Sequence, residues 1–210
     1  DVYKRQDFLI FPSEWAREKS GFSGDNCAVI HNGPLEDFHS FKKQKDIGKK
    51  IRVVAHHWST NPKKGFKFYS QLDEAIANND ALEFLYIGRL PEGLKFKNSR
   101  YIEASGDNEF LAKTIAEQDI YLTASEEEAG ANHVLEAMAC GLPIVYHENG
   151  GSIPNYCNEY GISYGSTEEM FQAIDGVSNN YSLYKTKVMC YNSSISSTIE
   201  QYVRAICDQK

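Results

Sequence analysis

Residues 125–151 read SEEEAGANHVLEAMACGLPIVYHENGG, and this stretch decides the fold. The spacing of its apolar residues predicts a short helix over residues 131–140. The following Gly-Leu-Pro ends that helix, because glycine readily takes the left-handed cap conformation and proline cannot continue a helix. Residues 143–146 then predict a buried strand, and Gly150-Gly151 predicts a turn where backbone can approach a ligand closely.

Two carboxylates bracket the start of this predicted helix. Glu128 lies in the loop before it, and Glu136 lies within it. Three small residues, Ala129, Gly130 and Ala131, stand at the mouth of the helix, where free backbone N–H groups and the positive end of the helix dipole favour an anion. We therefore expect a site for a ligand that is both anionic and rich in hydroxyl groups.

The pattern S-x-x-E-x7-E-A-M-A-x-G-x-P, followed by a strand and Gly-Gly, resembles the donor-sugar signature of glycosyltransferase family 4. The resemblance covers roughly residues 7–165 and is strongest over 120–151. It implies a retaining enzyme with the two-domain GT-B fold. The residues that carry it are Ser125, Glu128, Glu136, Ala137-Met138-Ala139, Gly141, Pro143 and Gly150-Gly151.

Predicted strands and helices alternate from Lys50 onward, which argues for a parallel sheet covered on both faces. The fold class we expect is α/β, a Rossmann-like doubly wound parallel sheet forming the C-terminal half of a GT-B fold. Ligands of such sheets bind beyond the carboxyl ends of the strands. No G-x-G-x-x-G follows any strand, which disfavours a dinucleotide-dependent dehydrogenase. The predicted strands are 51–56, 83–88, 101–104, 120–123, 143–146 and 161–164, and the predicted helices are 65–77, 109–117 and 131–140.

The rest of the chain divides by composition and by the resemblance. Residues 1–6, DVYKRQ, match what a common sequencing adapter encodes, and we expect them to be an artefact. Residues 7–31 predict strand, helix and strand, and are expected to be the remnant of an N-terminal acceptor domain; the alternative is the βαβ start of a single domain. The polar, Lys-rich residues 32–50 are expected to be an interdomain linker or a solvated face, and 51–165 the donor-binding domain.

Helical segments are predicted over the final residues, 166–210. In GT-B proteins such helices often pack back onto the N-terminal domain. We therefore expect them to expose apolar surface in this chain.

Composition limits the possible partners. The 22 basic and 29 acidic residues give a net charge of −7, so neither a nucleic acid nor an anionic membrane is the expected partner. No apolar run approaches the roughly 20 residues of a membrane-spanning helix. The five cysteines are widely spaced without C-x-x-C, which predicts reduced thiols in a cytoplasmic protein rather than disulfides or a zinc site.

The resemblance also implies how a leaving diphosphate would be stabilised. The family places an Arg and a Lys about five residues apart after the first strand of the donor domain. Lys64-Gly65 matches the Lys, but Ser59 stands at the Arg position. A charge-assisted hydrogen bond contributes roughly 1.5–3 kcal/mol, so this departure costs about one to two orders of magnitude in affinity unless another group compensates. The candidates for compensation are His56, His57, Lys63 and Arg89, and the alternative for Lys63 and Lys64 is a solvated loop.

The remaining site residues take their roles from the same resemblance. Glu136 matches the residue that accepts hydrogen bonds from ribose hydroxyls, and Glu128 matches the one that contacts the donor sugar. Glu128 and Lys64 are the candidate catalytic residues. Without the motif, both glutamates would be interpreted as surface carboxylates. The backbone near the Gly106-Asp107 loop is expected to contact the nucleotide base of the donor. Further donor-binding candidates are Gly130, Ala131 and Asn132, at the family's F-G-L positions, together with Ser59 and His133, although a helical histidine is more often packed or surface-exposed.

The predicted function is transfer of a hexose-type sugar from a nucleotide-diphosphate donor to a glycan or lipid-linked acceptor, without a metal ion or other cofactor. Two alternatives stay open: a catalytically silent nucleotide-sugar-binding domain, motivated by Ser59 and Gly130-Ala131, and a nucleotide-sugar epimerase on the same scaffold. A glycosidase acid–base pair needs two carboxylates that flank one bond, about 5 to 9 Å apart. This alternative is disfavoured, because Glu136 lies within the helix and, by the resemblance, points towards a ribose rather than the anomeric carbon. The case for a metal site at His56-His57 is also weak, because adjacent residues of a strand point to opposite faces of the sheet.

Overall fold

The computed structural model describes residues 8–207, and the predicted adapter-derived residues 1–6 lie outside this range. Its main body is a six-stranded sheet in the order β5-β4-β3-β6-β7-β8, with every neighbouring pair parallel. The chain enters at β3, moves outward to β5, and returns to the other side of β3 at β6. The strand order therefore reverses between β3 and β6, the position where open α/β sheets bind ligands. The strands are β3 (Ile51–His57), β4 (Leu82–Gly88), β5 (Arg100–Glu103), β6 (Ile120–Thr123), β7 (Ile144–His147) and β8 (Gly161–Tyr164).

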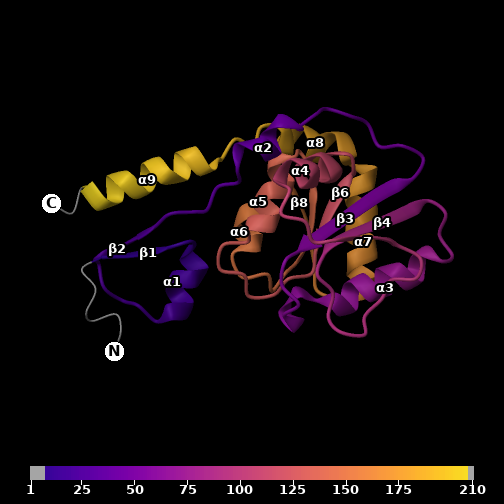
Figure 1. Cartoon of the computed structure of the whole chain (residues 1–210), viewed down its shortest axis with the longest axis horizontal. Coiled ribbons are helices and arrows are strands. Elements are labelled where there is room, and N and C mark those ends of the chain that lie inside the picture. Colours follow the sequence, from indigo (N-terminus) through magenta and orange to yellow (C-terminus); the bar gives the residue numbers. More distant parts are fainter. Residues whose placement is uncertain (1–7, 208–210) are drawn as a thin grey trace.

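Helices cover both faces of this sheet (Figure 1). Successive strand side chains point to opposite faces, so Val54 and Leu85 pack into one apolar cluster while Val53 and Phe84 pack into the other. The first cluster includes side chains of α2 (Glu36–Ser40), α4 (Asn108–Ala116), α5 (Asn132–Ala139), α6 (Ile153–Cys157) and α8 (Tyr181–Met189). The second includes side chains of α3 (Phe66–Ile76) and α7 (Thr167–Asn179). The predicted doubly wound α/β sheet is confirmed.

A smaller unit precedes the main sheet. β1 (Leu9–Phe11) and β2 (Cys27–Val29) form a two-stranded parallel sheet, and α1 (Glu14–Ser20) connects them. Ser13 caps α1 by accepting the Ala16 N–H. Figure 1 shows this unit to one side of the main sheet. The Ser13 hydroxyl also donates to the Ala129 carbonyl over 2.6 Å, so the small unit contacts the loop in front of α5.

The Lys-rich segment 32–50 is exposed over about half of its residues, but it contacts the main body at several points. Phe38 of α2 is fully buried against the first cluster. Lys42 donates to the Met189 and Tyr191 carbonyls at the end of α8, and Lys45 donates to the Glu117 and Gln118 carbonyls at the end of α4. The last carbonyls of a helix carry partial negative charge and lack partners within the helix, which explains why lysines bind there.

Some boundaries differ from the prediction. The one-turn helices α2 and α6 were not predicted, because five residues are too few to establish a helical period. α3 begins at Phe66 rather than at Gly65, which has a φ of +70° and follows the 3-10 turn η2 (Pro62–Lys64). A Cβ at Gly65 would lie 2.2 Å from the Ala124 carbonyl oxygen, so only glycine fits there.

The C-terminal helices differ in how they pack. α8 buries Val188 against the main body, whereas α9 (Ile195–Cys207) leaves a row of apolar side chains exposed. Exposure is 54% for Ile199 and Val203 and 59% for Ile206, which confirms for α9 the predicted apolar surface. Within residues 8–207, the helices are all too short or too polar to cross a membrane. All five cysteines are free thiols.

Candidate functional site

The candidate site lies at the carboxyl ends of β3 and β6, where two loops meet. The loop after β3 is braced by its own side chains: Ser59 Oγ accepts the Asn61 N–H over 3.1 Å, and Asn61 Oδ1 accepts the Lys63 N–H over 2.9 Å. The Glu126 N–H donates to the Lys63 carbonyl over 2.8 Å and joins this loop to the one after β6. Lys64 is therefore presented from a fixed turn.

The loop after β6 is held from its other side by the Gly-Gly turn. The Glu128 N–H donates to the Gly150 carbonyl over 3.2 Å, and the Ser152 N–H donates to the Glu128 carbonyl over 2.9 Å. Gly151 has a φ of +71°, and a Cβ there would lie 2.6 Å from the Glu128 backbone nitrogen and oxygen. The sequence predicted close approach to a ligand at this turn, but the structure shows close approach to the loop that carries Glu128.

The start of α5 faces the same space. Ala131 precedes the helix in a left-handed conformation, with φ 39° and ψ 46°, and no side chain of the described residues caps the helix. Uncapped N–H groups at a helix N-terminus bind anions well. Ala131 stands at a position where the resemblance places glycine, and its positive φ explains why that family uses glycine there.

A cavity of about 460 Å³ joins these parts. Its size falls in the range of about 300–1,000 Å³ typical of small-molecule sites. It brings together most of the site residues predicted from the sequence: Ser59, Lys64, Glu128, Gly130, Ala131, Asn132, His133 and Glu136. Gly106 and Asp107 do not line it. Asp107 instead caps α4 by accepting the Phe110 N–H over 2.9 Å, and a role for this loop at the base stays a prediction.

Two further lining residues, Asn32 and Trp58, had not been predicted, whereas His57 had been a candidate to compensate for the missing arginine and Ala129 a part of the helix mouth. The Asn32 side-chain amide donates to Asn132 Oδ1 over 2.7 Å and connects the turn after β2 to the start of α5. Trp58 is 41% exposed, unusual for so large an aromatic side chain. A tryptophan directly before a Ser-Thr-Asn-Pro turn was the available sequence signal for a binding loop.

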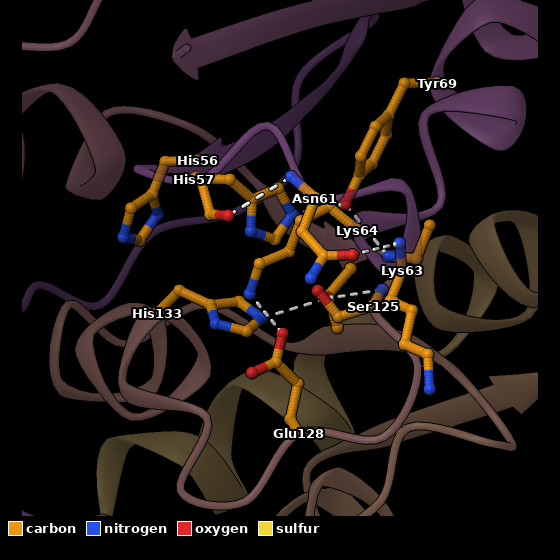
Figure 2. A network of polar contacts seen from close by, with 12 residues as sticks. His56, His57, Asn61, Lys63, Lys64, Tyr69, Ser125, Glu128 and His133 are labelled. Carbon is orange, nitrogen blue, oxygen red and sulfur yellow. Dashed lines mark hydrogen bonds and ion pairs between the residues drawn. The ribbon is translucent and has the colours of Figure 1, made fainter. Parts of the chain in front are cut away.

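The two glutamates of the motif are paired in different ways. Lys64 forms an ion pair with Glu128, and both side chains are mostly buried (Figure 2). Glu136 Oε2 lies 2.8 Å from Nε2 of His56, which is fully buried beneath it. Lys63 pairs instead with Glu127, and both of these side chains are about half exposed. The two adjacent lysines therefore lie in different places, Lys64 in the cavity and Lys63 at the surface.

Two buried histidines lie beside these carboxylates. The rings of His57 and His133 are 4.7 Å apart, and Figure 2 shows both near Lys64. Burial lowers the pKa of His57 well below its usual value, and the charge of Lys64 and the neighbouring His56 lower it further. Burial likewise lowers the pKa of His133, with further contributions from His57, Lys64 and His56. Both imidazoles are therefore neutral at pH 7.

A family model described as "Glycosyl transferases group 1" matches residues 48–180, which is more than half of the chain. The chain belongs to the group 1 glycosyl transferases. The match spans β3 to α7 and includes the loops that carry Lys64, Glu128 and Glu136. No curated protein matches the sequence.

Solved glycosyltransferases share the fold of this group 1 chain at low sequence identity. AviGT4, a glycosyltransferase involved in avilamycin A biosynthesis, is 19% identical with a TM-score of 0.67, covering 93% of this chain and 61% of its own. A glycosyltransferase from Rickettsia africae is 11% identical with a TM-score of 0.75 over 97% of this chain and 63% of its own. Alr3699/HepE from Anabaena, solved with UDP and glucose, is 15% identical with a TM-score of 0.72 over 96% and 63%. These matches confirm the GT-B type of Rossmann-like sheet, and the chain spans about three fifths of each solved chain.

Proposed function

We propose that this chain is the donor-binding half of a retaining glycosyltransferase. It would transfer a hexose-type sugar from a nucleotide-diphosphate donor to a glycan or lipid-linked acceptor. The observation that carries the proposal is the single cavity in which Lys64, Glu128 and Glu136 meet the uncapped start of α5. A cation, anion-binding amides and hydroxyl-accepting carboxylates together match the parts of a nucleotide sugar.

Each group would act on a different part of the donor. Lys64 and the first amides of α5 would bind the diphosphate, where negative charge develops as the sugar leaves. Glu136 would accept two vicinal ribose hydroxyls, held in orientation by His56. When the diphosphate replaces Glu128 as the partner of Lys64, Glu128 would become free to contact the sugar. In this scheme the departing phosphate oxygen accepts the acceptor's proton, so neither a protein base nor a metal ion is assigned.

A second candidate is a domain that binds a nucleotide sugar without transferring it. Lys64 is the only lysine or arginine among the described residues that line the cavity, because Ser59 replaces the expected arginine. With less positive charge to stabilise the leaving group, binding would persist better than turnover. Donor hydrolysis or transfer by the longer protein would decide against this candidate.

The first test is thermal unfolding of the 210-residue chain with UDP, GDP and ADP, for the parent and for Glu136→Ala. UDP comes first because Alr3699/HepE was solved with it. At 100 times the dissociation constant a ligand adds about 2.7 kcal/mol, or about 5–10 °C at this size. Glu126→Ala is the matched control, since Glu126 belongs to the same acidic run but does not line the cavity.

A shift with one nucleotide that disappears in Glu136→Ala and persists in Glu126→Ala supports the donor site and identifies the base. If no nucleotide shifts the folded parent chain, the proposed function fails for this chain.

A further inference from the structure

The cavity carries too little positive charge for its proposed ligand. Among its described lining residues, Lys64 is the only lysine or arginine, while Glu128 and Glu136 are both carboxylates. The diphosphate of a nucleotide sugar adds two negative charges. Unless another group becomes positive, the occupied site would hold an excess of negative charge in a partly buried space, which is costly.

Of the four side chains that the sequence offered as compensation, one lines the cavity. His56 lies behind Glu136, Lys63 pairs with Glu127 on the surface, and Arg89 lines a neighbouring cavity of about 650 Å³. His57 does line it, at the end of β3 and two positions before Ser59. It is almost completely buried and lies against His133.

We propose that His57, with His133 beside it, supplies the second positive charge by taking up one proton when the diphosphate of the donor binds. The inference rests on the proposed function and adds to it a way in which the site would favour ligands that carry a diphosphate. One proton, rather than two, is expected because the two rings are only 4.7 Å apart and would repel each other if both were charged. The proton comes from solvent and adds to an imidazole nitrogen, and no covalent bond of the donor changes.

The hydrogen bonds around the pair tolerate this change. His57 Nε2 lies 2.6 Å from the Tyr69 hydroxyl, which accepts the Ala124 N–H and also bonds with Thr123. His133 Nε2 lies 3.0 Å from Thr123 Oγ1. A hydroxyl can both donate and accept, so rotating the Tyr69 and Thr123 hydroxyls keeps each contact satisfied when an imidazole nitrogen gains a proton.

The charged and titratable groups around His57 explain why the proton is absent before the donor binds. Burial is the main cause that disfavours a charge on the ring, and Lys64 and His56 disfavour it further. Burial also raises the pKa of Tyr69, so that its phenol stays neutral. Tyr86 on β4 and Tyr121 on β6 are likewise neutral, because burial raises the pKa of each.

The two nearby carboxylates already have partners: Glu128 forms an ion pair with Lys64, and Glu136 forms a hydrogen bond with His56. An entering diphosphate brings additional negative charge that can stabilise a charged imidazole.

Calorimetry tests the proposal on the 210-residue chain. UDP-glucose, GDP-mannose and ADP-glucose are screened, and the one that binds is titrated at pH 7.5 in buffers of different ionisation enthalpy. A sugar nucleotide is used because its diphosphate diester does not itself titrate near neutral pH. The expected result is uptake of up to one proton per donor, with Kd rising by as much as tenfold per pH unit above the pKa of the bound state. The corresponding nucleoside, which lacks phosphate, is expected to cause no uptake.

Variants then locate the proton. His57→Gln is expected to abolish the uptake, whereas His147→Gln keeps it, because His147 is equally buried but packs against Phe68 and Tyr164 away from the cavity. If His57→Gln fails to fold, the parent measurement still tests the inference, because donor binding without proton uptake contradicts it. Donor binding without proton uptake overturns the inference and leaves the proposed function intact, whereas no binding by any sugar nucleotide overturns both.

Discussion

Lys63 and Lys64 are neighbours in the sequence, yet the structure gives them different partners. Lys64 is mostly buried and pairs with Glu128 in the cavity, whereas Lys63 pairs with Glu127 at the surface. We expect Lys64→Ala to weaken UDP binding about 10- to 100-fold, because a charge-assisted hydrogen bond contributes roughly 1.5–3 kcal/mol. Uridine affinity should not change. Titration calorimetry with both ligands checks this, with Lys63→Ala as the control; equal UDP affinity of all three proteins would remove Lys64 from the site.

The buried histidines predict how the stability of the free protein depends on pH. The pKa values of His57 and His133 are lowered by folding, so below the unfolded value of about 6.5 the unfolded chain binds more protons than the native one. Stability is therefore fully present above that value and falls as the pH decreases. Each histidine is expected to cost about 1 kcal/mol between pH 7 and 5.5.

Urea unfolding at these two pH values measures the loss, and His133→Gln should reduce it by about half. Asp73 and Asp119 do not confuse the result, because the pKa of each is lowered from an already acidic value and their contributions disappear only at lower pH. A loss of equal size in His133→Gln would contradict the assignment.

At the residue scale, residue type and spacing predicted which side chains lie together, while their roles stay predictions. Glu128 and Glu136 were identified because a family motif fixed their places, and the structure puts both in one cavity. His57 gave a weaker signal, since a histidine in a strand resembles any buried core residue until its neighbours are known. The contact between Asn32 and Asn132 joins residues from distant parts of the chain, which no local pattern reveals.

At the scale of elements, the sheet and its longer helices could be predicted because their apolar periods are clear. The segment before β3 could not, because its stability depends on lysines that bind carbonyls at the ends of other helices. Such contacts have no local period. The Lys-rich composition therefore predicted only a linker or a solvated face, whereas Lys42 and Lys45 also bind carbonyls at the ends of α8 and α4.

Lys45 provides a test of this interpretation. Its ammonium lies 3.0 Å from Asp119, which is completely buried, and it also donates to two carbonyls at the end of α4. We expect Lys45→Met to destabilise the protein by about 1–3 kcal/mol, because a buried carboxylate loses one of its two cationic partners. Arg52, the second partner at 2.8 Å, limits the loss.

Urea denaturation of Lys45→Met and of Lys43→Met provides the comparison, since Lys43 is exposed on the same segment. Lys43→Met should change stability by no more than about 0.5 kcal/mol. Equal effects of the two substitutions would mean that the segment is solvated after all.

At the scale of the whole molecule, contacts between distant parts of the chain converge on the rim of the cavity. The turn that carries Asn32 is held by the start of α9, where Thr198 Oγ1 donates to the His31 carbonyl and the Ile195 N–H donates to the Pro34 carbonyl. Pro12, before α1, accepts a hydrogen bond from the Tyr156 hydroxyl of α6. The small N-terminal unit and α9 therefore position Asn32 at the site, although neither belongs to the main sheet.

The exposed face of α9 yields a prediction about the whole chain. Beyond Thr198 this helix buries no side chain, and Ile199 and Val203 remain more than half exposed. We expect Ile199→Ser and Val203→Ser to change the free energy of unfolding by no more than about 0.5 kcal/mol each, because each side chain is more than half exposed. Phe38→Ala, by contrast, removes a buried ring between the segment before β3 and the main body and should cost about 3–5 kcal/mol. Urea unfolding of the three variants measures these differences, and a loss above 1 kcal/mol in either serine variant would show that the apolar face of α9 is covered in solution.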